Sequence, residues 1–316
     1  MLNRRSLVIS SALSFAGTRS MAQNRSLVLG FAQVGAESQW RAANTKSIQE
    51  SAEAAGVKLQ FVDGQGQQAL QIQAIRSFIQ QKVDVIALAP VVTTGWDEVL
   101  TEAKKARIPV ILTDRSVETQ DDNLYITTLG SDFTEEGRRA GRWLLRNAKP
   151  TGTIRIVELQ GSTGSAPAIE RKRGFDEVIR AVPRMKVVRS ETADFTQPKG
   201  KTVMASFLKA ESNNIQVVYA HNDDMALGAI QALEEAGLKP AKDVIVIGVD
   251  AVKGAFEAMR AGKMNVTVEC NPLIGPQLMD LVRLAADGKP IPKRVQSREG
   301  VFPMEIAERE YAKRKY

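Results

Sequence analysis

Short runs of β-branched and apolar residues alternate with longer stretches of helical periodicity from Ser26 onward. This alternation is typical of parallel sheets that are covered by helices on both faces. The near-continuous apolar run Val244–Ile247 suits a strand that is buried on both sides. Helical periodicity is clear over Ile72–Ile79 and over Ala226–Ala236, and the second of these stretches ends at Gly237. The sequence therefore predicts an α/β fold.

Ten segments are predicted to form strands, which exceeds what one small sheet usually holds. They are Leu27–Phe31, Lys58–Val62, Val83–Ala87, Pro109–Leu112, Leu124–Thr128, Thr153–Leu159, Lys186–Arg189, Gln216–Ala220, Val244–Val249 and Asn265–Val268. Five of these units precede Ser131 and five follow it. Because 316 residues are enough for two domains, we predict two Rossmann-like lobes with parallel sheets. The charged end from Glu308 onward is predicted to be a solvated tail.

Residues 1–22 have the pattern of an export signal. Arg4 and Arg5 precede the apolar run Leu7–Ala16, and Ser20–Ala22 suits a cleavage site, so cleavage is predicted near Ala22. The two arginines also resemble a twin-arginine signal, and the general and twin-arginine routes both stay open. An apolar run of this length is shorter than the ~20 residues of a membrane-spanning helix. The predicted location is the bacterial periplasm.

The composition excludes several classes of site. The net charge of +7 falls to +4 when Arg4, Arg5 and Arg19 are removed with the signal, and the remaining basic residues are interspersed with acidic ones. This distribution gives little reason to expect a nucleic-acid partner. One Cys and one His exclude an internal disulfide and a zinc site built from several such ligands. Cys270 is predicted to be a small buried hydrophobic residue.

Polar and aromatic residues follow four of the predicted strands, at the ends where open α/β sheets bind ligands. They are Gln33, Glu37, Ser38, Trp40 and Arg41 after the first strand, Asp114 and Arg115 after the fourth, Asn222, Asp223 and Asp224 after the eighth, and Asp250 after the ninth. Carboxylates, amides and guanidinium groups form paired hydrogen bonds with hydroxyl groups, and Trp offers a flat apolar face. This mixture favours a sugar over a phosphate or a fatty acid.

Each of these residues also has a structural interpretation. Asn222 and Asp223 precede a predicted helix and suit helix caps. Trp40 suits a core position, and Asp114 with Arg115 suits a surface ion pair. The convergence of four such groups on strand ends favours the binding interpretation.

Six segments together resemble the ribose/galactose type of periplasmic sugar-binding proteins, which serve ABC transporters. They are residues 29–43, 109–115, 169–175, 193–195, 219–225 and 248–250. Residues 34–41 and 89–96 are most similar to the galactofuranose-binding members of that group. The resemblance extends from about Leu27 to beyond Glu269. It implies a type I periplasmic binding protein fold, in which two lobes are joined by a three-strand hinge.

The resemblance also implies a set of ligand-binding residues. They are Glu37, Ser38, Trp40, Arg41, Asp114 and Arg115 from the N-terminal lobe, and Arg171, Phe195, Asn222 and Asp250 from the C-terminal lobe. Glu269 is a further candidate, because Glu269 and Cys270 stand where the ribose-binding pattern has Gln, and this departure argues against ribose. No run of alternating Asp and Asn ligands for calcium occurs, so neither a metal nor a cofactor is expected.

The family topology implies an N-terminal lobe of residues 23–130 plus 271–298 and a C-terminal lobe of residues 131–270 plus 299–316. The crossings near 129–131, 270–272 and 300 would then act as hinges. The function implied is capture of a monosaccharide, galactofuranose or a related sugar, by lobe closure. The implied partners are the permease subunits of an ABC transporter in the inner membrane, and the resemblance implies a monomer.

Two other binding classes are weighed against this interpretation. A repressor of the lactose-repressor type shares the two-lobed fold, but it requires a helix-turn-helix where this sequence has its predicted export signal. Dinucleotide binding would need a third glycine after Asp63–Gly66, and that segment follows the second predicted strand.

An enzyme is the third alternative. A catalytic triad would have to use His221, the sole imidazole of the chain, or His221 with Cys270. A glycosidase acting through paired carboxylates from Glu37, Asp114 and Asp250 stays open on the sequence alone.

Overall fold

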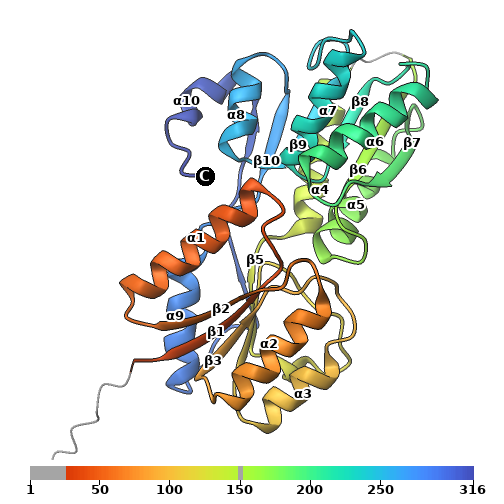
Figure 1. Ribbon diagram of the computed structural model, residues 1–316. Coiled ribbons are helices and arrows are strands. Elements are labelled where there is room, and N and C mark those ends of the chain that lie inside the picture. The colour runs from red at the N-terminus through yellow and green to blue at the C-terminus, as the bar shows by residue number, and fades with distance from the viewer. Residues whose placement is uncertain (1–25, 149–151) are drawn as a thin grey trace, which may run out of the picture.

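The computed structural model describes residues 26–148 and 152–316, which form two α/β lobes (Figure 1). The predicted export signal lies outside the described residues. All ten predicted strands are present, with ends that differ by up to three residues from the prediction, and they divide into two sheets as expected. None of the helices in the described part of the chain is long and apolar enough to cross a membrane.

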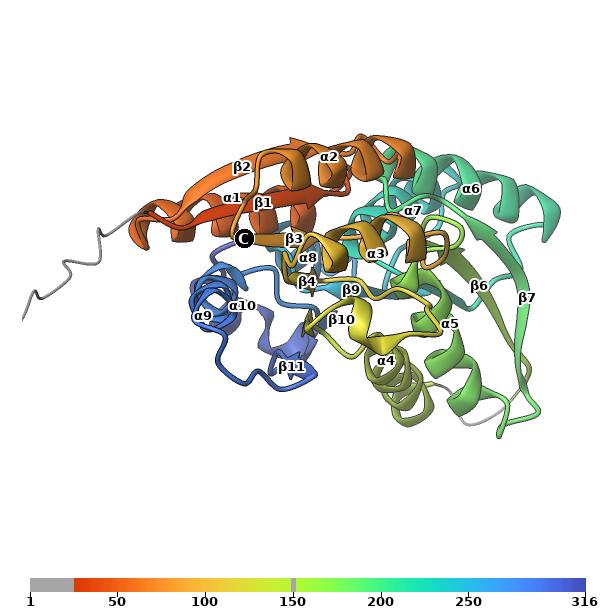
Figure 2. The same cartoon turned by 90° about the horizontal axis from the view of Figure 1, so that it is seen from below.

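The first sheet has the strand order β11-β5-β4-β3-β1-β2, and all its pairs are parallel. Its strands are β1 (Val28–Gln33), β2 (Lys58–Asp63), β3 (Val85–Leu88), β4 (Val110–Thr113), β5 (Thr127–Gly130) and β11 (Arg294–Gln296). Helices α1 (Gln39–Ala54) and α9 (Gly275–Ala286) pack on one face, and α2 (Gln68–Gln80) and α3 (Asp97–Lys105) on the other (Figures 1 and 2). Alternate residues of the strands therefore join two separate apolar cores.

The second sheet has the order β12-β10-β9-β8-β6-β7, with only the β10–β12 pair antiparallel. Its strands are β6 (Ile154–Gln160), β7 (Met185–Thr192), β8 (Val217–Ala220), β9 (Ile245–Asp250), β10 (Val266–Glu269) and β12 (Val301–Pro303). Helices α4 (Phe133–Asn147) and α5 (Ala166–Ile179) pack together beside it, and α6 (Gln197–Ala210), α7 (Asp223–Glu235), α8 (Lys253–Arg260) and α10 (Ala307–Tyr311) form a second contiguous group. Short 3₁₀ turns lie at Asp122–Leu124 and Met304–Ile306.

The charged end of the chain differs from its prediction as a solvated tail. Strand β12 pairs with β10, and helix α10 packs on α8. The Arg314 guanidinium lies 4.5 Å from the centre of the Phe302 ring and 5.1 Å from that of Phe256. Its Nη1 is 2.9 Å from Oε1 of Glu269. The long aliphatic stems of charged side chains let such a segment cover apolar surface, which its charge pattern does not indicate.

The chain passes between the two sheets three times, after β5, after β10 and between β11 and β12. The crossings expected near residues 129–131, 270–272 and 300 fall in these three connections. The limits of the two lobes themselves stay a prediction.

Glu299 connects the three crossings through its side chain. Its Oε1 accepts a hydrogen bond from the Ser131 hydroxyl and another, of 3.2 Å, from the backbone N–H of Asn271. The Ser131 oxygen is also 3.2 Å from the sulfur of Cys270. Burial and the nearby Glu136 carboxylate raise the pKa of Glu299 to about 8. A protonated carboxyl therefore joins the crossings at neutral pH.

Replacing this group by its neutral isostere should remove a pH dependence of stability. Because the pKa of Glu299 is higher in the folded chain than in the unfolded chain, its contribution is complete below about pH 4.5 and is lost as the pH rises through about 8. We expect Glu299→Gln to match the wild type at pH 5 and to be about 4 kcal/mol more stable at pH 8.5. Urea unfolding at the two pH values measures this difference, and an equal difference at both would contradict the assignment.

Candidate functional site

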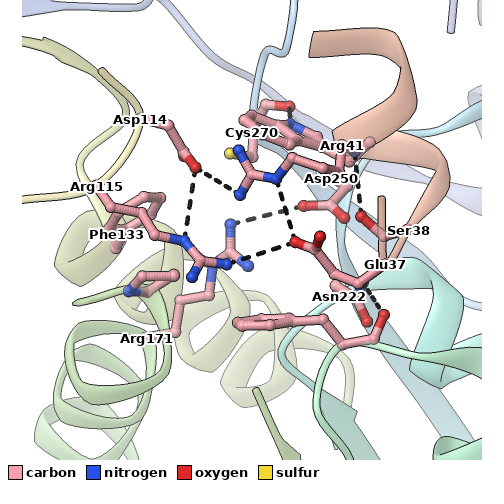
Figure 3. A pocket seen from close by; sticks show the side chains of 13 residues that line it. Glu37, Ser38, Arg41, Asp114, Arg115, Phe133, Arg171, Asn222, Asp250 and Cys270 are labelled. Atoms are coloured by element: carbon pink, nitrogen blue, oxygen red, sulfur yellow. Dashed lines mark hydrogen bonds and ion pairs between the residues drawn. The ribbon is translucent and has the colours of Figure 1, made fainter. Parts of the chain in front are cut away.

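Ten of the eleven predicted binding residues line one pocket between the lobes (Figure 3). They are Glu37, Ser38, Trp40, Arg41, Asp114, Arg115, Arg171, Phe195, Asn222 and Asp250, and Phe133, Pro167 and Cys270 complete the lining. The lining side chains lie close together and leave a cavity of about 20 Å³, which has room for about one water molecule. A monosaccharide therefore enters only when the lining side chains or the lobes move apart. The role of the lining residues in binding stays a prediction.

The pocket lies at the carboxyl ends of the strands of both sheets. Asp114 directly follows β4, and Asp250 is the last residue of β9. Both adopt positive φ angles, 64° at Asp114 and 124° at Asp250, and Phe195 after β7 has a φ of 62°. Residues other than glycine rarely adopt positive φ angles, and backbone strain of this kind is concentrated at functional sites. These strand ends are therefore shaped to direct their side chains into the space between the lobes.

In the first lobe, Arg41 holds two carboxylates. Its Nη2 donates to Oδ2 of Asp114 at 2.7 Å, and its Nε donates to Oε1 of Glu37 at 3.1 Å. Its Nη1 donates to Oε1 of Gln33 at 3.1 Å, which places the predicted Gln33 behind the pocket as a support. Burial opposes the charge of Arg41, but the two carboxylates outweigh it and raise its pKa. Burial would raise the pKa of Glu37, but the positive charges of Arg41 and Arg115 lower it below its usual value.

Arg115 is the less satisfied cation of the first lobe. Its contacts with Asp114 and Glu37 are both 3.6 Å long, and its buried Nε has no hydrogen bond. Burial and repulsion from Arg41 lower the pKa of Arg115 to about 10. Its guanidinium lies 5.4 Å from the ring centre of Phe195 in the other lobe, and Oε2 of Glu37 is buried without a partner. Donors and an acceptor are therefore free for a ligand.

In the second lobe, Arg171 is held from behind by a residue that the sequence analysis did not identify. Its Nε donates to Oε2 of the buried Glu136 at 2.7 Å, and its Nη1 donates to the backbone oxygen of His221 at 2.5 Å. Its Nη2 faces Asp250 at 3.6 Å. Burial raises the pKa of Asp250, and the Arg171 charge opposes that shift. Glu136 lies in the first turn of α4, six residues after the end of β5, but the sequence analysis named no candidate residue after the fifth predicted strand.

Two pocket residues combine structural and binding geometry. The Asn222 side chain caps α7 by accepting from the Met225 N–H at 3.0 Å, and it also donates to the backbone oxygen of Phe195 at 3.0 Å. Ser38 caps α1 by accepting from the Arg41 N–H at 3.1 Å. The predicted cap role of Asn222 is therefore confirmed, and both residues also line the pocket, where their role in binding stays a prediction.

Trp40 joins the lobes. Its indole N–H donates to the backbone oxygen of Cys270 at 2.7 Å, and its ring packs with the apolar core of the second lobe, although α1 belongs to the first. Cys270 is buried as predicted, but it also lines the pocket. Its sulfur lies near the carboxyl groups of Glu136 and Glu299, all within 4.8 Å of one another. Oε2 of Glu136 binds Arg171 and Oε1 of Glu299 accepts the hinge hydrogen bonds, and we assign no metal there.

Glu269 does not line the pocket, so its prediction as a ligand-binding residue is corrected. Its carboxylate binds Arg314 at 2.9 Å and accepts from the Gly300 N–H at 3.0 Å, on the side of the C-terminal segment. Successive side chains of an extended segment point in opposite directions, and the neighbouring Cys270 faces the pocket. Glu269 therefore faces the third crossing and stabilises it.

The formal charges of the lining itself balance, and the buried Glu136 behind Arg171 is a fourth carboxyl group outside the lining. Three arginines, Arg41, Arg115 and Arg171, face three carboxylates, Glu37, Asp114 and Asp250. A phosphate or an ammonium group would disturb this balance in a buried site, where uncompensated charge is costly. The geometry therefore suits a neutral ligand with many hydroxyl groups.

Comparison with known proteins agrees with this geometry. The family model described as a periplasmic binding protein domain matches residues 29–290. The chain belongs to this family. It is 47% identical to the galactofuranose-binding protein YtfQ of Escherichia coli strain K12 over 314 residues, which cover 98% of both chains. The predicted family resemblance is thus confirmed.

Two solved structures show the same architecture. A protein from Mycobacterium smegmatis in complex with β-D-fucofuranose is 55% identical, with a TM-score of 0.88 over 90% of this chain and 94% of that chain. The binding component of an arabinose ABC transporter from Shewanella sp. ANA-3, bound to α- and β-L-arabinofuranose, is 46% identical, with a TM-score of 0.88 over 91% and 95% of the two chains.

The family and these relatives are solute-binding proteins, so this periplasmic binding protein is not an enzyme. The contacts of His221 agree with that conclusion. Its Nε2 lies 3.1 Å from Oε1 of Glu158, and its Nδ1 accepts from the Gly161 N–H at 3.4 Å. Burial lowers the pKa of His221, whose ring is fully enclosed. Neither nitrogen is directed at a nucleophile.

Replacing Arg171 and Arg115 by methionine should change the free energy of unfolding in different ways. We expect Arg171→Met to lower the free energy of unfolding by about 3–5 kcal/mol, because it leaves the buried Glu136 without a counter-charge. Arg115→Met should leave stability within about 1 kcal/mol of the wild type or raise it, because the site disfavours the charge of Arg115. Urea unfolding of the ligand-free proteins compares them, and equal losses would contradict this account.

Proposed function

We propose that this periplasmic binding protein captures a monosaccharide in its furanose form, galactofuranose or a related sugar, and delivers it to the permease of an ABC transporter. The observation that carries the proposal is the charge-balanced, buried pocket shared by the two lobes. The furanose form is supported by the fucofuranose and arabinofuranose bound to the two similar structures and by the similarity to the galactofuranose-binding protein YtfQ.

Binding by lobe closure follows from the division of the lining. Glu37, Asp114 and Arg115 come from the first lobe, and Asn222 and Asp250 come from the second. A ring whose hydroxyl groups bond to both sets favours the closed form, because those bonds exist together only there. Closure excludes water, so a sugar that leaves a guanidinium or carboxylate unpaired is rejected.

The proposal also includes the limits of the lobes, the location of the protein and its oligomeric state. The lobes comprise residues 23–130 plus 271–298 and residues 131–270 plus 299–316, and the crossings between them act as hinges. The protein works in the periplasm after cleavage near Ala22, as a monomer without a cofactor. Docking of the closed form on the permease subunits supplies the sugar for transport.

Thermal-shift and calorimetric titration with D-galactose, D-fucose, L-arabinose and D-ribose test the ligand class. A binding sugar at 100 times its Kd should raise the free energy of unfolding by about 2.7 kcal/mol. We expect stabilisation by at least one of the first three sugars and weaker or no stabilisation by ribose. A crystal structure of the stabilised complex identifies the ring form, and a complex that holds only the pyranose would contradict the furanose assignment.

Pocket variants separate binding from folding. We expect Arg115→Met and Asp250→Ala to weaken sugar binding at least about 100-fold, because each removes a buried partner of ligand hydroxyl groups. Arg76→Met is the matched control, because Arg76 forms exposed ion pairs with Glu98 and Glu102 on the first lobe. It should bind like the wild type. Near-wild-type affinity in both pocket variants would refute the site.

A further inference from the structure

A contact between the lobes lies beside the pocket without lining it. The backbone N–H of Gln39, the first residue of α1, donates to Oδ2 and Oδ1 of Asp224 at 3.2 and 3.4 Å. The Gln39 side-chain Nε2 lies 3.5 Å from the same carboxylate. Asp224 belongs to α7 of the second lobe, and neither residue is among those that line the pocket. Figure 1 shows the start of α1 at the boundary with the second lobe.

The acidic residues are distributed unequally between the two helices. The first turn of α1 contains no acidic residue, whereas the first turn of α7 contains Asp223 and Asp224. Asp223 binds the second lobe itself, through Thr267 and the Val252 N–H. Asp224 instead turns to the other lobe and accepts hydrogen bonds from the start of α1, whose first turn has no acidic residue of its own.

The contact between Gln39 and Asp224 is closely packed on the side of the second lobe. Asp224 is only 6% exposed, although Gln39 beside it remains exposed. A Cβ atom added to Gly254, in the first turn of α8, would lie 3.2 Å from both Oε1 and Nε2 of Gln39. The Gln39 side chain therefore lies close against the backbone of the second lobe at Gly254.

We propose that Asp224 and the start of α1 form a latch that holds the lobes closed and strengthens ligand binding without touching the ligand. The inference rests on the proposed capture of a sugar by lobe closure. The latch exists only when the lobes meet, so it slows opening and leaves the encounter with the sugar unchanged. Asp224 is a positioning residue in this scheme.

The latch acts through its hydrogen bonds more than through charge. Burial, with Glu37 adding like-charge repulsion, raises the pKa of Asp224 to about 6, and the hydrogen bonds from Gln39 oppose the shift. Asp223 and Asp250 are the other carboxylates that interact with it. A neutral side chain of the same shape should therefore retain the latch.

Four variants isolate the hydrogen bond. Gln39→Pro removes the N–H at the first helical position, where proline is well tolerated, and Ser38 already has the extended backbone that precedes proline, with φ −146° and ψ 163°. Gln39→Ala is its control and keeps the N–H. Asp224→Ala removes the acceptor, and Asp224→Asn keeps its shape.

We expect Gln39→Pro and Asp224→Ala each to raise the koff of the bound sugar about five- to tenfold and to leave kon within twofold. The double variant should be no weaker than either single one, because both remove the same bond. Asp224→Asn and Gln39→Ala should bind within about twofold of the wild type. Stopped-flow binding measures these constants. Wild-type koff in Asp224→Ala, or additive losses in the double variant, would overturn the latch.

A measurement without sugar separates the latch from the proposed function. Spin labels at the exposed positions Lys105→Cys and Lys209→Cys report the distance between the lobes, and the native Cys270 is buried. The population at short distance should fall in Gln39→Pro and Asp224→Ala and persist in Asp224→Asn. Equal populations at short distance in the wild type, Gln39→Pro, Asp224→Ala and Asp224→Asn would overturn the latch even if the sugar binds. If no sugar binds the wild type, the proposed function fails, and the distance measurement still decides on the latch.

Discussion

The structure depends on three guanidinium groups that are held out of water between the lobes. Each lobe neutralises its own cation before closure, since Arg41 holds Asp114 and Glu37, whereas Arg171 holds Glu136. Buried charges are tolerated only when paired in this way. Arg115 has no carboxylate of its own, because it shares those of Arg41 at longer distance. Two half-sites are therefore preformed, and the group with unused hydrogen-bonding capacity lies where a ligand would meet both.

The start of helix α1 contacts both the charged groups of the pocket and the second lobe. Ser38 caps α1, Gln39 faces Asp224, Trp40 packs on the second lobe, and Arg41 turns back to the carboxylates of the first. Successive side chains of a helix point about 100° apart, so these adjacent residues reach different partners, and Gln39 does so through its backbone N–H. The rigid start of α1 thus keeps the pocket, the hinge carbonyl and the interlobe contact in fixed relation.

The sequence predicts what periodicity and strand ends encode. The two sheets and the ten pocket residues that follow strands or belong to quoted motifs are placed as expected, because ligand sites of α/β sheets have a fixed topological position. Glu136 was missed because a carboxylate inside a helix has the pattern of an ordinary surface residue. Glu269 was misassigned because one residue of register decides which way a strand side chain points. The binding roles of the pocket residues and the lobe limits stay predictions.

The hinge shows why such networks escape sequence analysis. Ser131, Cys270 and Glu299 are separated by more than a hundred residues or by a whole helix, and no spacing rule relates them. They meet because three crossings of the chain share one narrow junction, where Glu136 also interacts with the Cys270 thiol. Since Glu136 holds Arg171 on its other side, the pocket and the hinge belong to one continuous polar network. Contacts made with Arg171 in the pocket therefore act on the same carboxylate that borders the hinge.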